Sequence, residues 1–141
     1  MPSIDHIPQR ESISRRNFAP PLPIRPRMTL DHTKLEVYHR ALDLLDHVDE
    51  VYEAMPPGRG HFRDQLDRAA TSIVLNIAEG AGEFSKDEKH RFYRIARRSA
   101  TETAAILDVL QRRRAVDTAI IQPTRDLLIR VVSMLVRLAS A

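Results

Sequence analysis

Four arginines on one predicted helix are the residues whose type and spacing indicate definite chemistry: Arg91, Arg94, Arg97 and Arg98. Three of them, Arg91, Arg94 and Arg98, follow at i, i+3 and i+7, so a helix aligns them in one stripe. Such a row of like charges repels itself unless something negative lies opposite. Guanidinium groups bind phosphate through two hydrogen bonds at once. The stripe therefore predicts contact with the backbone of RNA or DNA.

The same arginine stripe has two other interpretations. Residues 43 to 53 contain an acidic stripe of similar spacing: Asp43, Asp46, Glu50 and Glu53. The two stripes could pair between subunits of an oligomer, or both could be solvated surfaces. Among aromatic residues only Tyr93 is expected to flank the arginines, because Phe92 is assigned to the apolar side. Base stacking is therefore not expected, and any nucleic-acid binding should be weakly sequence-specific.

A metal site is the next candidate, because His39, Asp43 and His47 follow at i, i+4 and i+8. At ~1.5 Å per residue the two histidines are roughly 12 Å apart along a helix axis. One helix cannot bring both side chains to the same ion. We therefore expect a polar helix face, with no metal and no cofactor.

A catalytic site would have to use the polar residues near the packed face of the second and third predicted helices, which are Arg68, Asn76, Glu79, Ser99 and Glu102. Glu79 and Glu102 could act as paired carboxylates. No nucleophile with a base and no phosphate-binding loop accompanies them. We expect Asn76 and Glu79 instead to bond to backbone, Arg or Ser partners and to set helix register. The sequence predicts no catalytic residue, and the protein is not expected to be an enzyme.

These side chains must be positioned by helices, because apolar residues recur at helical spacing in four segments. The segments are residues 33–55, 62–79, 85–113 and 117–139. Ser85 with Glu88 forms a capping box and Asp117 a second N-cap, while Pro123 either kinks the last helix or marks its first turn. Short connections force neighbouring helices to be antiparallel. The predicted fold is all-α: an antiparallel up-and-down four-helix bundle.

The apolar faces predict both a core and a surplus. The expected core positions of the first helix are Leu35, Tyr38, Leu42, Leu45, Val48 and Tyr52. Leu44 and Val51 widen that face beyond what one bundle needs, and the last helix is also broadly apolar. Surplus apolar surface in a water-soluble chain favours self-association.

The segment from Arg68 to Gly82 combines a narrow stripe of apolar, mostly small residues with two glycines. The stripe consists of Leu66, Ala69, Ala70, Ile73 and Ile77. Small side chains let another helix approach closely, and Gly80 and Gly82 are expected to end the helix.

This segment resembles the signature of the four-helix-bundle proteins encoded in intervening sequences of 23S ribosomal RNA genes. The matching residues are Arg68, Ala69, Ala70, Ser72, Ile73, Asn76, Ile77, Ala78, Glu79, Gly80 and Gly82. The likeness covers roughly residues 33 to 140. The chain departs from the pattern at Val74 and Leu75, where Pro-Ser is usual, at Arg98, where Gly is usual, and at Thr103, where Leu is usual. These departures concern helix geometry near residue 74 and packing near residue 98.

The resemblance implies an oligomer and two kinds of partner. Members of this family form ring-shaped homopentamers, so a homopentamer is expected. A related branch, the accessory variability proteins of diversity-generating retroelements, forms similar pentamers that bind nucleic acid and a reverse transcriptase. RNA or DNA, and a protein such as a reverse transcriptase, are therefore the expected partners. A structural or adaptor ring that binds a protein, with the charged stripes used between subunits, is the alternative.

Composition sets the remaining bounds. The 141 residues contain no cysteine, which excludes disulfides and thiolate chemistry. No apolar run approaches the ~20 residues that span a bilayer, and no signal-peptide core is present, so a cytoplasmic location is expected. Residues 1–30 carry five Arg, one Asp and one Glu, whereas residues 31–141 carry 17 basic and 17 acidic groups. The first 30 residues, rich in proline, are expected to be a disordered arm outside a bundle of residues 31–141, with Met28 as an alternative start.

Overall fold

The computed structural model describes residues 30–141, which form four α-helices preceded by one short 3-10 helix. The elements are η1 (Asp31–Lys34), α1 (Glu36–Ala54), α2 (Gly60–Gly82), α3 (Lys86–Arg112) and α4 (Thr118–Ser140). The predicted arm, apart from Leu30, and the alternative start at Met28 lie outside the described residues.

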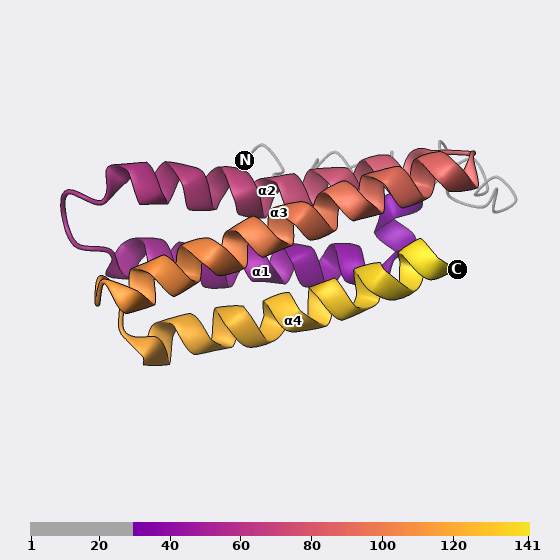
Figure 1. Ribbon diagram of the computed structural model, residues 1–141. Helices are drawn as coiled ribbons and strands as arrows, with labels where there is room; N and C mark the ends of the chain where they lie inside the picture. Colours follow the sequence, from indigo (N-terminus) through magenta and orange to yellow (C-terminus); the bar gives the residue numbers. More distant parts are fainter. Residues whose placement is uncertain (1–29) are drawn as a thin grey trace, which may run out of the picture.

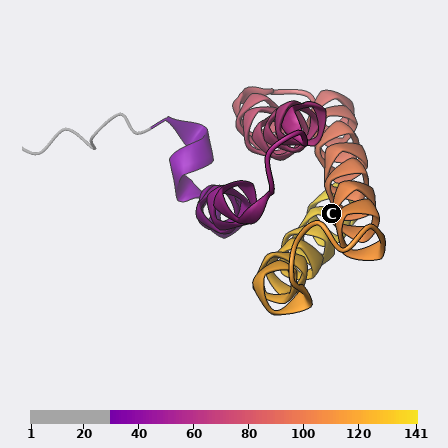
Figure 2. The ribbon, with the colours of Figure 1, turned by 90° about the vertical axis from the view of Figure 1, so that its left-hand side faces the viewer.

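Successive helices run in opposite directions and are joined by short connections, so the predicted up-and-down four-helix bundle is confirmed (Figure 1). Seen from the end, the helices occupy the corners of a rough square in chain order (Figure 2). Within the described residues α1 packs against α2 and α4, and α3 also packs against α2 and α4. Consequently α1 and α3 lie at diagonally opposite corners, and their backbones do not approach each other closely.

The two predicted N-caps are confirmed. The Ser85 hydroxyl oxygen accepts a hydrogen bond from the Glu88 backbone N–H at 3.3 Å, and Asp117 accepts one from the Ala119 N–H at 3.1 Å. These bonds satisfy backbone donors that have no partner inside the helix. Pro123 lies within α4, one turn beyond its start, so the alternative that it marks the first turn is wrong.

The glycines of α2 have a different role from the predicted one. The helix does not end at Glu79 but continues through both glycines to Gly82. Gly80 is buried, and a Cβ atom added to it would lie 2.7 Å from Cε1 of Tyr93 and 3.1 Å from Cβ of Phe92. Glycine is needed here because it lets α3 approach the α2 backbone, and it does not terminate the helix.

The core face of α1 also differs from the prediction. Its buried residues are Val37, Ala41, Leu44, Val48 and Val51. Leu44 and Val51, which looked surplus, are fully buried, whereas Leu42 is 37% exposed. The sequence of α1 contains two overlapping apolar stripes at helical spacing. The positions of α2 and α4 determine which stripe is buried.

The core of α2 and α3 agrees better with the expected pattern. All five apolar residues of the predicted α2 stripe are buried: Leu66, Ala69, Ala70, Ile73 and Ile77. On α3, Tyr93 was expected beside the arginines on the solvent side, but it is only 5% exposed. Its ring packs against the backbone at Gly80, and burial raises the pKa of its hydroxyl.

Tyr52 and Arg63 hold the turn between α1 and α2. The Tyr52 hydroxyl donates a hydrogen bond to the Arg63 carbonyl, and Arg63 Nη2 donates one to the Met55 carbonyl at 3.0 Å. Burial, assisted by the negative charges of Asp67 and Asp64, raises the Tyr52 pKa above its ordinary value of 10.0. The folded chain therefore favours the protonated phenol.

Replacing Tyr52 with Phe is expected to lower the free energy of unfolding by about 1 kcal/mol at neutral pH, because one hydrogen bond is lost. Above pH ~10 the unfolded wild-type chain ionises this phenol while the folded chain retains its proton. Stability linked to Tyr52 is therefore lost as pH rises from the ordinary pKa towards the raised one. Urea titrations between pH 7 and 11 should show the gap between wild type and variant narrowing at the alkaline end. A constant gap would contradict the assignment.

Candidate nucleic-acid interface

The four predicted arginines, Arg91, Arg94, Arg97 and Arg98, all lie exposed on the solvent side of α3. The opposite side of the helix is buried and consists of small and aliphatic residues together with Tyr93. We refer to these four residues as the arginine stripe. This placement follows from helical periodicity. Apolar and small residues recur at i, i+3 and i+4 and are buried against α2 and α4, so the arginines between them face the solvent.

Most of the positive charge of the arginine stripe is not neutralised within residues 30–141. Arg91 pairs with Glu88 at 3.3 Å between Nε and Oε2, and its guanidinium carbon lies 4.8 Å from the centre of the Phe92 ring. Both members of that ion pair are about half exposed, so water and salt weaken it. Arg94, Arg97 and Arg98 form no ion pair with the described residues. The stripe can therefore bind an external anion without first breaking a buried contact.

The acidic residues predicted to compete for the arginines lie on α1. This helix contains one basic and six acidic residues, a net charge of −5, whereas α3 contains seven basic and four acidic residues, a net charge of +3. Asp43 pairs with Arg40 at 3.1 Å. Asp46, Glu50 and Glu53 are exposed and unpaired within the described part of the chain. Since α1 and α3 lie at opposite corners, the two stripes do not pair within one subunit.

The polar residues considered for catalysis are partly brought together. Asn76 Nδ2 donates to the Ser72 carbonyl at 2.8 Å and contacts the Ser72 hydroxyl at 3.0 Å, and the Ser72 hydroxyl bonds the Ser99 hydroxyl at 2.8 Å. Asn76 therefore has the backbone and Ser partners that were predicted, but both belong to Ser72 on the same helix. The bond that links α2 to α3 is the one between Ser72 and Ser99. Glu79 and Glu102 are exposed and form no side-chain hydrogen bond within residues 30–141. The expected partners of Glu79 were therefore wrong.

The three candidate metal ligands on α1 have separate surroundings. His39 Nε2 lies 2.8 Å from the Thr33 carbonyl, Asp43 pairs with Arg40, and His47 faces α4. Among the described residues no three His, Asp or Glu side chains come close enough to hold a metal ion.

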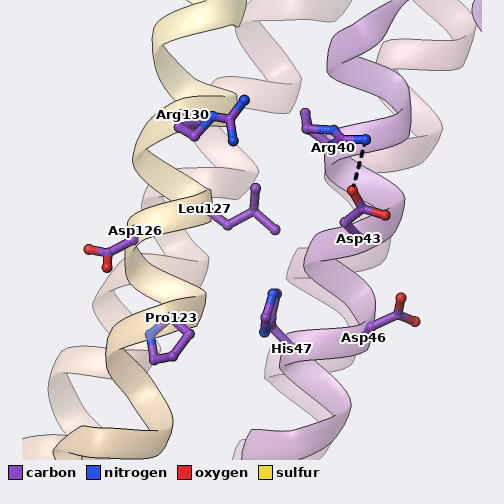
Figure 3. A pocket seen from close by; sticks show the side chains of 8 residues that line it. All are labelled: Arg40, Asp43, Asp46, His47, Pro123, Asp126, Leu127 and Arg130. Carbon is purple, nitrogen blue, oxygen red and sulfur yellow. Dashed lines mark ion pairs between the residues drawn. The ribbon is translucent and has the colours of Figure 1, made fainter.

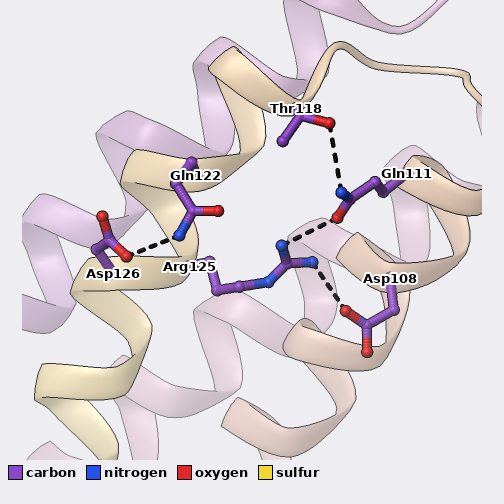
Figure 4. A network of polar contacts seen from close by, with 6 residues as sticks. All are labelled: Asp108, Gln111, Thr118, Gln122, Arg125 and Asp126. Carbon is purple, nitrogen blue, oxygen red and sulfur yellow. Dashed lines mark hydrogen bonds and ion pairs between the residues drawn. The ribbon is translucent and has the colours of Figure 1, made fainter.

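A polar network between α3 and α4 was not predicted from the sequence (Figure 4). Arg125 Nη2 donates to Asp108 at 2.8 Å and Nη1 donates to Gln111 at 2.9 Å, while Gln111 donates to the Thr118 hydroxyl at 3.3 Å. No local spacing signals a pair that is 17 positions apart. The network uses Arg125 to join two helices, so this cation is not part of the arginine stripe.

The fold and this surface define a class of protein: an all-α four-helix bundle with one strongly basic helix face. The family model described as 23S rRNA-intervening sequence protein matches residues 33–137. The chain therefore belongs to this family, as its signature residues predict. No curated protein shows significant similarity to the chain. Within the described residues, no helix is long and apolar enough to cross a membrane.

The departures from the family signature do not disturb the bundle. Val74 is buried and Leu75 is 58% exposed within an uninterrupted α2. Arg98, where the family has Gly, lies on the solvent side of α3, so its larger side chain meets no packed helix. Thr103, where Leu is usual, is fully buried and donates its hydroxyl hydrogen to the Ser99 carbonyl at 2.8 Å.

Proposed function

We propose that this protein is a non-enzymatic, oligomeric helical bundle of the cytoplasm that binds RNA or DNA through Arg91, Arg94, Arg97 and Arg98. The observation that supports the proposal most strongly is that three of these exposed arginines, on a single helix side, have no anionic partner within residues 30–141. Guanidinium groups in this arrangement suit the repeated phosphates of a nucleic-acid backbone. A reverse transcriptase remains the protein partner that the family likeness implies.

The binding we propose is driven by the backbone and is weakly sequence-specific. Tyr93 is buried against α2, and Phe92 is half-buried with the Arg91 guanidinium beside it. The stripe therefore lacks an open aromatic platform for stacking bases. Specific reading of sequence requires contacts to base edges or stacked bases, whereas arginine contacts to phosphate only position the strand.

We further propose that the oligomer is a homopentamer, as the family likeness implies. Apolar side chains outside the core support self-association: on α4, Ile129 is 58% and Val136 is 41% exposed, with half-buried Val132 between them. Their spacing places them along one line of the helix. Five copies of the arginine stripe would make binding multivalent, so weak contacts would add up along one strand.

The alternative function is an adaptor ring that binds a protein and uses the charged stripes between subunits. The opposite net charges of α1 and α3 favour this adaptor, because the two helices of neighbouring subunits could attract each other. The geometry counts against it, because the two stripes lie at opposite corners of the bundle. If α1 of one subunit pairs with α3 of the next, and the two helices lie on opposite sides of the bundle, the subunits form an open row. A closed ring needs two pairing surfaces that lie at an angle to each other on each subunit. We therefore place nucleic-acid binding first.

The proposed function predicts salt-dependent binding. Labelled single- and double-stranded RNA and DNA are titrated with the full chain across a salt series. The affinity should fall with salt, with a log–log slope of about 0.9 per phosphate neutralised on duplex DNA and about 0.7 on single strands. A version starting at Met28 tests the contribution of the first 27 residues, and oligomer mass is recorded in parallel. Absence of binding at any salt, with the oligomer intact, would exclude this function and favour the adaptor.

A further inference from the structure

Two exposed arginines lie at the opposite end of α3 from the arginine stripe. Arg112 is the last residue of the helix, and Arg114 follows in the turn to α4. The two side chains line the same open surface groove. Neither forms an ion pair with any residue that the structure describes. In this respect they resemble Arg94 and differ from Arg40 on α1, which is paired with Asp43 (Figure 3).

The one carboxylate that lines this groove is already bound. Asp108 accepts a hydrogen bond from Arg125 Nη2 at 2.8 Å, which offsets its charge (Figure 4). Asp117, the other carboxylate of this connection, caps the first turn of α4. Two carboxylates thus stand against four arginines, which are Arg112, Arg113, Arg114 and Arg125. The excess of positive charge at this end of α3 favours an external anion.

Arg114 has a backbone conformation that favours glycine. Its φ is 52°, in the left-handed region. The Arg114 N–H donates to the Gln111 carbonyl at 3.0 Å, and the Ala115 N–H donates to the Leu110 carbonyl at 2.9 Å. Helices commonly end with this pair of bonds, and glycine is the usual residue at the position of Arg114. Other L-residues lower the stability there. The chain therefore has a guanidinium group where the fold by itself favours no side chain.

Arg112 lies on the same side of α3 as the arginine stripe. It follows Arg94 by 18 residues, which is about five helical turns or ~27 Å along the axis. Short exposed side chains, those of Thr101 and Ala105, lie on this side between them. Glu102 follows Arg94 by eight residues and so lies about 80° round the helix from this line. A strand can therefore contact both ends of α3 without crossing an unpaired carboxylate.

We propose that Arg112 and Arg114 form a second phosphate-binding site for the strand that the arginine stripe binds, so that the strand runs along the exposed side of α3. This inference rests on the proposed function and adds the length of nucleic acid that one subunit contacts. At ~3.4 Å of rise per stacked nucleotide, the distance from Arg94 to Arg112 corresponds to about eight nucleotides. A trinucleotide covers only about 10 Å and reaches one site at a time. A longer strand engages both sites, and the linkage raises its affinity.

The test compares binding of a single-stranded trinucleotide and a single-stranded dodecanucleotide to the full chain at low salt. The Arg112→Ala/Arg114→Ala variant should bind the dodecanucleotide about tenfold or more weakly, because two phosphate contacts are lost. Its log–log salt slope should fall by about 1.4 for each subunit that contacts the strand. Binding of the trinucleotide should change less than about twofold, because the arginine stripe still holds it.

Arg68→Ala/Arg137→Ala is the matched control for the double variant. It removes the same two charges from exposed positions outside both sites. Its affinity for either oligonucleotide should change less than about twofold, because salt screens charges that are far from the strand.

Arg114→Gly separates binding from stability. This variant should unfold at a higher urea concentration than wild type, because glycine suits a φ of 52°. It should nevertheless bind the dodecanucleotide about threefold or more weakly, since one phosphate contact is lost. If Arg114 served only to stabilise the end of α3 through the helix dipole, its loss would lower the urea midpoint instead.

The proposal is wrong if the double variant loses the same factor for both oligonucleotides, or if the control loses as much as the double variant. It is also wrong if Arg114→Gly unfolds at a lower urea concentration or retains full affinity. These results would leave the proposed function standing, provided that wild type binds and the Arg91/Arg94/Arg98→Ala variant does not. If wild type binds neither oligonucleotide at any salt, the proposed function and this second site both fail.

Discussion

Replacing Arg91, Arg94 and Arg98 together with alanine should weaken RNA and DNA binding about a hundredfold or more at low salt. On duplex DNA each arginine that neutralises one phosphate contributes about 0.9 to the log–log salt slope, so the slope should fall by about 2.7 for each subunit that contacts the strand. All three side chains are exposed, and only Arg91 has an ion pair, with Glu88. Their removal should therefore change the free energy of unfolding by less than about 1 kcal/mol. Circular dichroism and oligomer mass check that the fold and assembly persist.

A matched control separates position from total charge. Changing Arg68, Arg113 and Arg137 to alanine removes the same three charges from exposed positions outside the stripe. This control should retain most of the affinity and of the salt slope. Equal losses in both triple variants would show that binding depends only on net charge, and the assignment to α3 would then be wrong.

The triple variant also tests the adaptor alternative. If it falls apart into monomers, the arginines belong to a subunit interface. A charge exchange then identifies the partner surface: Arg94→Glu with Arg98→Glu should break assembly, and Asp46→Arg with Glu50→Arg should restore it. A variant that remains oligomeric but no longer binds nucleic acid supports the proposed function.

Replacing Gly80 with Val should lower the free energy of unfolding by about 2 kcal/mol or more, the range seen when a packed core is overfilled. Even the first added carbon would lie 2.7 Å from Cε1 and 3.0 Å from Cδ1 of the Tyr93 ring. That ring is buried and has little room to move. The α2 and α3 helices must separate to relieve the overlap. The loss is measured by urea unfolding. Wild type and variant are compared at the same protein concentration, because the apparent stability of an oligomer depends on that concentration.

Gly82→Val is the matched control for this prediction. It introduces the same side chain two residues later in α2, where an added Cβ meets nothing within 4 Å. Neither glycine has a positive φ, so backbone strain does not distinguish the two positions. Gly82→Val should change stability by less than about 0.5 kcal/mol. If both variants are equally destabilised, the contact with Tyr93 is not the cause, because the change from Gly to Val by itself improves helix propensity.

Much of the fold could be predicted because its signals are local. The caps at Ser85 and Asp117 depend on side chains that bond backbone two or three residues away, and such bonds are visible as spacing in the sequence. The solvent side of α3 was also predictable, because a row of arginines is too costly to bury unpaired. For the same reason all four stripe arginines are found where the helical period places them.

The predictions failed where two local solutions had similar energies. On α1 both Leu42 and Leu44 could face a core, and only the presence of α2 and α4 selects Leu44. In the sequence, Gly80 was compatible both with the end of a helix and with a close contact between two helices. The Tyr93 ring packed against Gly80 shows that the close contact is its role. The link from Arg125 to Asp108 spans two helices, so no spacing within one helix predicts it.

By itself, the sequence determined the four helices, their antiparallel order, the family and the side of α3 that carries the arginines. These properties follow from helical periodicity, short connections and the cost of burying charge, all of which act over a few residues. Only the tertiary structure decided that the acidic and basic stripes lie at opposite corners, that Gly80 serves helix contact, and that Arg125 joins α4 to Asp108 and Gln111 of α3. Those outcomes depend on how whole helices pack, because residues far apart in the chain become neighbours only after each helix has buried its apolar side.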